Sequence, residues 1–291
     1  MFTDIYSPVE PLKHPHLSEL WIKRDDLIDP YISGNKWRKL KYLLSKAHAA
    51  NQQHLVTFGG AYSNHLLATA AAASKAGLKA TAFVRGEPVK NEMLMLCQLF
   101  GMTLIFVDRE SYKHKTELFQ QYFGQDTDAF FIDEGGASME AVTGCAEIIN
   151  ELPKDIDHIF CAAGTGTTAA GLLHGIHQQG LKTTLHVVPA LKGGDFIATE
   201  IFNYLGHTDQ LILHTDYHFG GYAKTKPELI DFMKTFVRNQ GILIDPVYTA
   251  KMMYAIYDLA EKDYFKKDAK IIALHTGGLM GILGMKDKFV F

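Results

Sequence analysis

The chain has 291 residues, of which 47% are apolar and 21% are charged. This composition excludes a mostly disordered protein, and at roughly 150 residues per domain the length suggests about two domains. The formal net charge of −3, without a long run of like charges, argues against a nucleic-acid partner. The three widely spaced cysteines form no CxxC pair, which argues against a secreted disulfide framework and favours a reducing compartment.

The N-terminal residues show no basic segment followed by an apolar one, so we expect no signal peptide. The longest apolar stretch, residues 66–84, is interrupted by polar residues and glycine. It therefore falls short of the ~20 apolar residues that a membrane helix needs. We expect a cytoplasmic protein with no membrane segment.

Short β-branched and aromatic runs alternate along the chain with segments of helical periodicity. The expected strands lie at residues 20–23, 54–58, 80–84, 103–107, 129–132, 158–162, 184–188, 211–214 and 270–275. The expected helices lie at residues 35–49, 63–75, 91–100, 111–122, 138–150, 167–179, 227–238 and 247–262. This alternation predicts βαβ units, parallel sheets and an α/β fold. Ligand sites in such folds lie where strands end and helices begin.

A glycine- and threonine-rich segment follows the strand expected at 158–162 and opens a helix. Its central residues are Gly164, Thr165, Gly166, Thr167 and Thr168. Glycines let backbone N–H groups approach an anion, and threonines add hydroxyl donors. The spacing also fits the dinucleotide-binding fingerprint, but residues 185–190 lack the acidic group expected about 20 residues further on. We favour a phosphate-binding loop, with a purely connecting turn as the alternative.

Two further segments place polar side chains at the start of a helix. Ser63 and Asn64 follow the strand expected at 54–58, but the GxSxG motif of serine hydrolases is absent. A capping role is the alternative for this pair.

Lys36 follows Gly34 and Asn35, and cationic neighbours would lower its pKa and make it an amine nucleophile or Schiff-base partner. Those neighbours are Lys23, Arg24, Arg38 and Lys39, and a solvated basic helix face is the alternative.

The C-terminal part offers hydroxyl groups at the same kind of position. Tyr248 lies in the segment 245–249 and Thr276 in the segment 275–278, each after an apolar run. Tyr222 follows a glycine pair. No metal-binding spacing of histidine or cysteine occurs, so no metal is predicted.

Together these segments resemble the pyridoxal-phosphate enzymes of fold type II, and within them the 1-aminocyclopropane-1-carboxylate deaminase/D-cysteine desulfhydrase family. GNKxRK followed by GGxxSN is the most specific part of the resemblance. The motifs that carry it are KRDD at 23–26, GNKWRKL at 34–40, GGAYSN at 59–64, GTGTT at 164–168, DPVY at 245–248 and HTGG at 275–278.

The resemblance implies a role for each matched residue. Lys36 would bind pyridoxal 5'-phosphate covalently and later move protons at the substrate. Asn64 would contact the 3-hydroxyl of the cofactor, and Thr276 would face its pyridine nitrogen. The remaining implied groups are Gly164, Thr165, Gly166, Thr167 and Thr168 for the phosphate, Ser63 for the substrate carboxylate, and Tyr222 and Tyr248 flanking the substrate.

Some positions depart from the common pattern of this family. Thr249 follows Tyr248, as in the desulfhydrase-like branch, where the cyclopropane-opening enzymes have glutamate. Residues 279–281, Leu-Met-Gly, replace the usual Pro-Ala-Leu, and His65 stands where glutamine is common. We place His65 among the substrate-binding residues and expect these changes to alter substrate choice.

The implied fold has two open, twisted parallel sheets with helices on both faces, as in the β subunit of tryptophan synthase. A large cofactor-binding domain would comprise residues 1–51 and 151–291, and a small α/β domain, residues 52–150, would be inserted into it. The implied activity is deaminating β-elimination on a small amino acid such as D-cysteine, in a homodimer. The alternatives are a 1-aminocyclopropane-1-carboxylate deaminase, a nicotinamide oxidoreductase and a non-catalytic ligand-binding protein.

Overall fold

The computed structural model describes residues 5–290, and residues 1–4 and 291 lie outside the described part. The strands are β1 (Val9–Pro11), β2 (Leu20–Lys23), β3 (His54–Gly60), β4 (Lys79–Arg85), β5 (Thr103–Val107), β6 (Ala129–Ile132), β7 (His158–Ala163), β8 (Thr184–Pro189), β9 (Leu211–Leu213) and β10 (Ile271–Leu274). The α-helices are α1 (Asn35–Ala49), α2 (Asn64–Ala76), α3 (Glu92–Leu99), α4 (Lys115–Phe123), α5 (Met139–Asn150), α6 (Thr167–Gln178), α7 (Phe196–Leu205), α8 (Pro227–Gln240) and α9 (Thr249–Glu261).

These elements build two sheets. The larger has six strands in the order β1-β2-β10-β7-β8-β9, and the smaller has four in the order β5-β4-β3-β6. All paired strands in the described part are parallel except β1 and β2, which are antiparallel. The predicted α/β class with parallel sheets is therefore confirmed.

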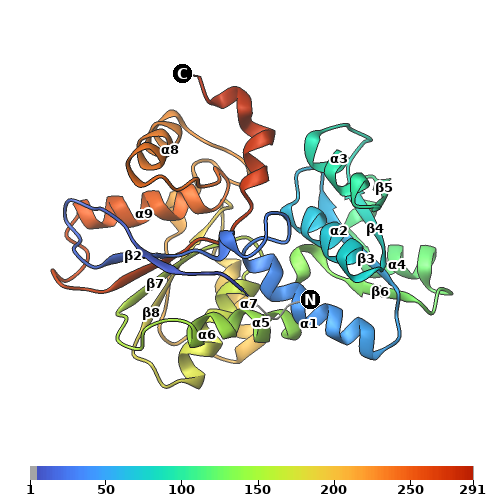
Figure 1. Ribbon diagram of the computed structural model, residues 1–291, viewed down its shortest axis with the longest axis horizontal. Coiled ribbons are helices and arrows are strands. Elements are labelled where there is room, and N and C mark those ends of the chain that lie inside the picture. Colours follow the sequence, from blue (N-terminus) through green and yellow to red (C-terminus); the bar gives the residue numbers. More distant parts are fainter. Residues whose placement is uncertain (1–4, 291) are drawn as a thin grey trace.

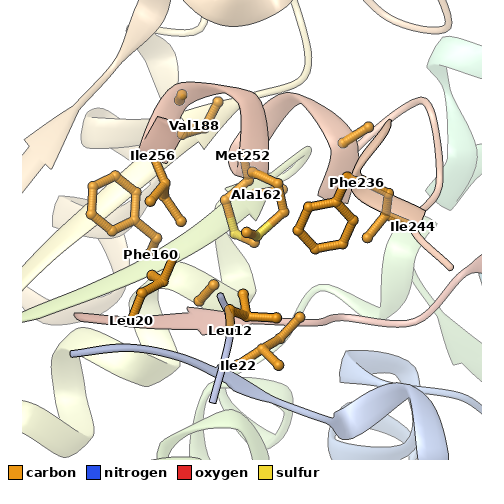
Figure 2. Close-up of a cluster of buried hydrophobic side chains, with 14 of the residues drawn as sticks. Leu12, Leu20, Ile22, Phe160, Ala162, Val188, Phe236, Ile244, Met252 and Ile256 are labelled. Atoms are coloured by element: carbon orange, nitrogen blue, oxygen red, sulfur yellow. The ribbon is translucent and has the colours of Figure 1, made fainter. Parts of the chain in front are cut away.

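Helices cover both faces of the six-stranded sheet (Figure 1). Because side chains alternate along a strand, Phe160 of β7 packs toward α8 and α9, whereas Ile159 and Cys161 pack toward α5, α6 and α7. Figure 2 shows Phe160 in one apolar layer with Met252 and Ile256 of α9. Burial on both faces explains why these strands are largely apolar instead of alternating with polar residues.

The four-stranded sheet has its own apolar layers. One contains side chains of α2 and α3, and the other contains Leu118 of α4. Helix α1 precedes this sheet in the chain, yet Trp37, Leu40 and Leu43 belong to its core. The domain boundaries expected at 51/52 and 150/151 stay a prediction.

Several parts of the chain differ from the expected elements. The helix expected from residue 111 begins at Lys115, because residues 111–113 form a 3-10 turn and His114 has non-helical angles (φ −101°, ψ 53°). Strand β1, helix α7 and the 3-10 segment η5 (Leu279–Lys288) were not expected. None of the helices in the described part is long and apolar enough to span a bilayer.

Candidate active site

The predicted site segments lie beyond the carboxyl ends of parallel strands. Strand β3 leads into α2, β7 into α6, and β10 into residues 275–278, while α1 follows the short 3-10 turn η1 (Asp25–Leu27) after β2. Helices α1, α2 and α6 begin in these segments, so unpaired backbone N–H groups and their partial positive charge are directed toward the region between the sheets.

The start of α1 fixes Lys36 next to two other segments. Gly34 has φ +63°, and a Cβ there would lie 1.8 Å from the carbonyl oxygen of Thr276, so only glycine fits. The Asn35 side chain donates a hydrogen bond to Thr168 Oγ1 at 2.9 Å. Lys36 is thereby held close to both the glycine-threonine segment and the segment after β10.

The amine of Lys36 has an unusual electrostatic environment. Its Nζ donates to the carbonyl oxygen of Gly135 at 3.4 Å, and Lys39 Nζ donates to the same oxygen at 2.9 Å. Burial, and then the charge of Lys39, hold the pKa of Lys36 well below its ordinary value. A neutral amine at Lys36 suits nucleophilic attack on a carbonyl group.

The other cations expected around Lys36 are neutralised by carboxylates. Arg38 is fully buried and pairs with Asp25 and Glu151, and Lys23 Nζ lies 2.7 Å from Glu151. Arg24 pairs with Asp26 and Glu10. The interpretation that all of these groups lower the pKa of Lys36 is therefore wrong. Among them, Lys39 is the one that acts on Lys36.

The glycine-threonine segment opens α6 next to Lys36. Thr167 and Thr168 are buried, and Thr165 Oγ1 lies 3.2 Å from Thr167 Oγ1. A Cβ at Gly135 would lie 3.4 Å from Thr165 and 3.9 Å from Lys36 Nζ. The amine and the hydroxyl-lined start of α6 therefore face the same point.

Ser63 and Asn64 lie at the start of α2. Ser63 is the N-cap residue, but its side chain makes no capping hydrogen bond, which argues against the capping alternative. Asn64 lines a small cavity together with Lys36 and Gly278. A Cβ at Gly278 would lie 2.5 Å from Asn64 Nδ2, so glycine is needed for the two segments to approach.

His65 is 2% exposed, and a Cβ at Gly136 would lie 3.4 Å from its ring and 3.6 Å from the Lys39 side chain. Because the Thr57 hydroxyl donates to the carbonyl oxygen of Ile132 at 2.9 Å, it must accept the His65 Nε2 proton across 2.7 Å. His65 Nδ1 is then a bare acceptor, and it has no hydrogen-bond partner among the described residues. Burial and the two nearby lysines hold the pKa of His65 well below its usual value, so the ring is neutral.

Tyr248 lies at the start of α9 against the glycine-threonine segment. A Cβ at Gly164 would lie 3.3 Å from the Tyr248 hydroxyl. The buried Asp245 carboxylate accepts hydrogen bonds from the backbone N–H groups of residues 247–249 and from the Thr249 hydroxyl. Thr249 therefore belongs to the turn that positions Tyr248, and its side chain is fully buried.

Tyr222 and Thr276 lie on two sides of this arrangement. The Tyr222 ring centroid is 6.1 Å from that of Tyr248, and Tyr222 is 43% exposed, so it lies at the rim. Thr276 is 8% exposed, and its carbonyl oxygen accepts from the backbone N–H of Asn35. Burial and the neighbouring Tyr222 raise the pKa of Tyr248 well above 10, so its hydroxyl keeps its proton.

The sequence interpretation missed two contributors to the site. Lys39 was noted only as one basic residue among several, although it lies one helical turn from Lys36 on the same face. Gly135 was not singled out, although residues 134–136 follow β6 in the same strand–glycine pattern as the other segments. That pattern was a usable signal.

Comparisons with known proteins agree with this geometry. The family model for pyridoxal-phosphate-dependent enzymes matches residues 5–277. A Pyrococcus horikoshii protein named provisionally as a 1-aminocyclopropane-1-carboxylate deaminase is 31% identical over 94% of this chain and 88% of its own length. The bifunctional D-cysteine desulfhydrase/1-aminocyclopropane-1-carboxylate deaminase of Arabidopsis thaliana is 29% identical over 94% of this chain and 76% of its own.

A solved structure gives the same result at the level of the fold. The crystal structure of a homologue of 1-aminocyclopropane-1-carboxylate deaminase superposes with a TM-score of 0.83 at 30% identity, covering 97% of this chain and 92% of that one. The nicotinamide alternative finds no support in these matches. The chain belongs to the pyridoxal-phosphate-dependent enzymes of fold type II, and within them to the 1-aminocyclopropane-1-carboxylate deaminase/D-cysteine desulfhydrase family.

Proposed function

We propose that this enzyme removes the β-substituent and the amino group from a small amino acid, with D-cysteine as the reference substrate. The balanced reaction converts D-cysteine and water into pyruvate, ammonia and hydrogen sulfide. One observation carries the proposal: the buried amine of Lys36, whose pKa is lowered, faces the same point as the threonine-lined start of α6. An amine for a carbonyl group and N–H donors for a phosphate are the two ends that pyridoxal phosphate requires.

The residues present fit this cofactor. Thr165, Thr167 and Thr168 offer hydroxyl donors at a helix start, where the dipole favours an anion. Lys39 is buried, and its hydrogen bond to the carbonyl oxygen of Gly135 leaves further N–H donors for a negative group nearby. Pyridoxal phosphate, when bound, supplies an electron sink that stabilises negative charge at the substrate α-carbon.

We propose the following roles for the other site residues. Residues 164–168 hold the phosphate, Asn64 contacts the 3-hydroxyl, and Thr276 faces the pyridine nitrogen. The hydroxyl of Thr276 does not enforce a protonated ring as a carboxylate would, which suits elimination and limits transamination. Ser63, whose hydroxyl caps nothing, receives the substrate carboxylate.

The remaining roles concern proton movement. Lys36 takes the proton from the α-carbon, since burial and the charge of Lys39 lower its pKa and favour the neutral amine. Tyr248 keeps its proton and can donate it to the departing group. Tyr222 flanks the substrate at the rim of the site, next to Tyr248. His65 is proposed as a substrate-binding residue with a neutral ring.

The visible spectrum of the purified protein tests the cofactor assignment. Wild type incubated with pyridoxal phosphate should show the absorbance band of a lysine-bound cofactor, and borohydride should bleach it. Lys36→Ala should lack the band. A wild-type protein that shows no such band under these conditions would contradict the central assignment.

A substrate panel tests the reaction. D-cysteine should release pyruvate and sulfide, whereas L-cysteine and D-serine test the choice of enantiomer and leaving group. Aminocyclopropane carboxylate is included because relatives carry the name of its deaminase; it would release 2-oxobutanoate and ammonia. If none of the four yields a 2-oxo acid while the cofactor is bound, the proposed elimination is wrong.

We further propose a homodimer and the division into a large domain (1–51 and 151–291) and a small inserted domain (52–150). The family resemblance supports the dimer. The separation of β3 to β6 into one sheet supports the division. Static light scattering should give twice the mass of one chain, and a monomer at assay concentration would contradict the dimer.

A further inference from the structure

Lys251 of α9 carries a buried charge that the proposed reaction does not use. Its side chain is fully buried, and its Nζ donates to the carbonyl oxygens of Ala190 at 3.0 Å, His218 at 2.9 Å and Gly221 at 2.8 Å. An ammonium group has three N–H bonds, and all of them are used here. Within the described residues, no carboxylate forms an ion pair with it. Burying a charge in this way costs free energy. The groups that the Lys251 ammonium contacts should therefore show what the charge holds in place.

Two of the three carbonyl groups bracket the turn that precedes Tyr222. His218 and Gly221 lie at its two ends. Within and after the turn, positive φ angles occur at Phe219 (+51°), Gly220 (+98°), Gly221 (+118°) and Ala223 (+54°). Residues in this region are strained unless they are glycine, so such a turn persists only where its surroundings hold it.

The third carbonyl group belongs to the cofactor side of the site. Ala190 follows β8, and its N–H donates to the carbonyl oxygen of Ala163 at 2.8 Å, directly before Gly164. Tyr248 lies against Gly164 and starts the helix that carries Lys251 one turn later. A single ammonium therefore joins the Tyr222 turn, the glycine-threonine segment and α9.

We propose that Lys251 is a positioning residue that acts as a built-in monovalent cation and clamps Tyr222 over the glycine-threonine segment. The activity part of this inference rests on the proposed function, in which Tyr222 and Tyr248 flank the substrate. The structural part, in which the ammonium holds the turn at residues 218–223, does not depend on it.

The three carbonyl groups have a second consequence. Convergent carbonyl oxygens are the ligands that proteins use to replace the hydration shell of K⁺. Removing the Lys251 side chain leaves the three oxygens directed at one point. A Lys251→Ala variant should therefore gain a dependence on ammonium or K⁺ that wild type does not have, because Lys251 already supplies the charge.

Two variants and one control test the inference. Lys251→Met keeps the bulk of the side chain and removes the charge, and Lys251→Ala opens the carbonyl site. Lys262→Met is the matched control, because Lys262 lies at the end of the same helix, is 64% exposed and pairs only with Asp258 in the described part. The measurements are trypsin cleavage after Lys224, cofactor absorbance, and kcat and KM with D-cysteine.

In Lys251→Met, cleavage after Lys224 should accelerate and kcat should fall at least about tenfold, while the cofactor band remains, because only Tyr222 is misplaced. In Lys251→Ala, ammonium chloride should restore both trypsin resistance and kcat, and sodium chloride at the same ionic strength should not. Lys262→Met should behave as wild type. A cleavage rate in Lys251→Ala equal to that of wild type in sodium chloride would overturn the inference, and so would the absence of any slowing by ammonium chloride.

The readouts separate this inference from the proposed function. If wild type does not act on D-cysteine, the cleavage rate and the ammonium-dependent melting temperature of Lys251→Ala still decide the clamp. If Lys251→Met does not fold, Lys251→Gln offers two of the three donors at similar reach and should give an intermediate cleavage rate. A Lys251→Gln protein that is as resistant as wild type contradicts the need for the full charge.

Discussion

The amines of Lys36 and Lys39 approach the same carbonyl oxygen of Gly135, at 3.4 and 2.9 Å. Two ammonium groups so close together repel each other, and burial adds to the cost of charging either one. Lys36 carries the proposed chemistry, and the charge of Lys39 acts on that chemistry by lowering the pKa of Lys36. The effect of removing that charge can be measured directly.

We predict that Lys39→Met raises the pKa of Lys36, because the repelling charge is removed while the bulk of the side chain is kept. Only the neutral amine reacts with an aldehyde. The pH profile for the rate at which the apoprotein forms the lysine-bound cofactor band should therefore shift to higher pH. Lys46→Met is the control on the same helix, because Lys46 is 57% exposed and pairs with Glu140. Equal pH profiles for wild type and Lys39→Met would contradict the prediction.

The buried hydroxyl groups of Thr57 and Thr69 allow a matched comparison. Thr57 bridges His65 and the carbonyl oxygen of Ile132, whereas Thr69 Oγ1 has no hydrogen-bond partner among the described residues. Thr57→Val should lower the free energy of unfolding by about 1–3 kcal/mol, because the His65 N–H and the carbonyl lose their partner. Thr69→Val should be neutral or stabilising. Urea unfolding measures both, and the reverse order would refute this account of His65.

At the scale of elements, a buried ion network fixes the start of α1. Arg38 donates from Nε and Nη2 to both oxygens of Asp25 at 3.1 and 2.8 Å, and its Nη2 also donates to Glu151, just beyond α5, at 2.8 Å. Arg38 and Asp25 are fully buried. The pairing of planar groups with fixed geometry orients the helix, and Lys36 is on its first turn.

We predict that Arg38→Met lowers the free energy of unfolding by roughly 3–5 kcal/mol, because it leaves the Asp25 carboxylate buried without its partner. Lys41→Met on the same helix should change it by less than about 1 kcal/mol, since its pair with Glu147 is partly exposed. Denaturant unfolding of the two variants checks the difference. Similar losses in both would show that the network does not hold α1 as described.

The elements that the sequence predicted well have local signals. The bounds expected for α1 and for β2, β5 and β6 match the structure, because helical periodicity and β-branched runs end there at glycine or polar residues. Helix α7 was missed although Ile197 and Ile201 are spaced by one turn and both are buried. The apolar pattern of α7 is short. Strand β1 was missed because it is three residues long and contains a proline, which disfavours a strand assignment.

The candidate site was predictable as a set of segments but not as a set of contacts. Strand–glycine–helix patterns placed Lys36, Asn64 and Thr168 at strand ends, and parallel sheets gather such ends at one edge. The ion pairs of Arg38 with Asp25 and Glu151 join residues far apart in the chain. Their partners are chosen by tertiary packing, so the sequence alone indicated a free basic cluster.

At the scale of the whole molecule, three histidines form a chain across the six-stranded sheet. His158 Nδ1 lies 2.9 Å from His186 Nε2, and His186 Nδ1 lies 2.8 Å from His214 Nε2. His186 is fully buried and stacks on Phe160 with ring centroids 4.4 Å apart. Burial, and then the neighbouring histidines, lower the pKa of His186 to about 3, and burial also lowers the pKa values of His158 and His214.

The lowered pKa values of these three histidines predict how the free energy of unfolding depends on pH. Below pH 6.5 the unfolded state binds protons at these rings that the folded state does not, so the free energy of unfolding falls as pH falls. The contribution is fully present above pH 6.5 and is lost on the way to the folded pKa of about 3; for His186 alone it is on the order of 5 kcal/mol.

His186→Phe tests the assignment, because phenylalanine keeps the stacking on Phe160 and cannot take up a proton. At pH 7 the variant should be less stable by about 1–3 kcal/mol, since His158 and His214 each lose a partner. Between pH 6.5 and 4 its melting temperature should fall less steeply than that of wild type. His48→Gln, a surface control, should keep the wild-type slope. A His186→Phe slope equal to that of wild type would assign the acid sensitivity to other groups, of which the buried His65 is the first candidate.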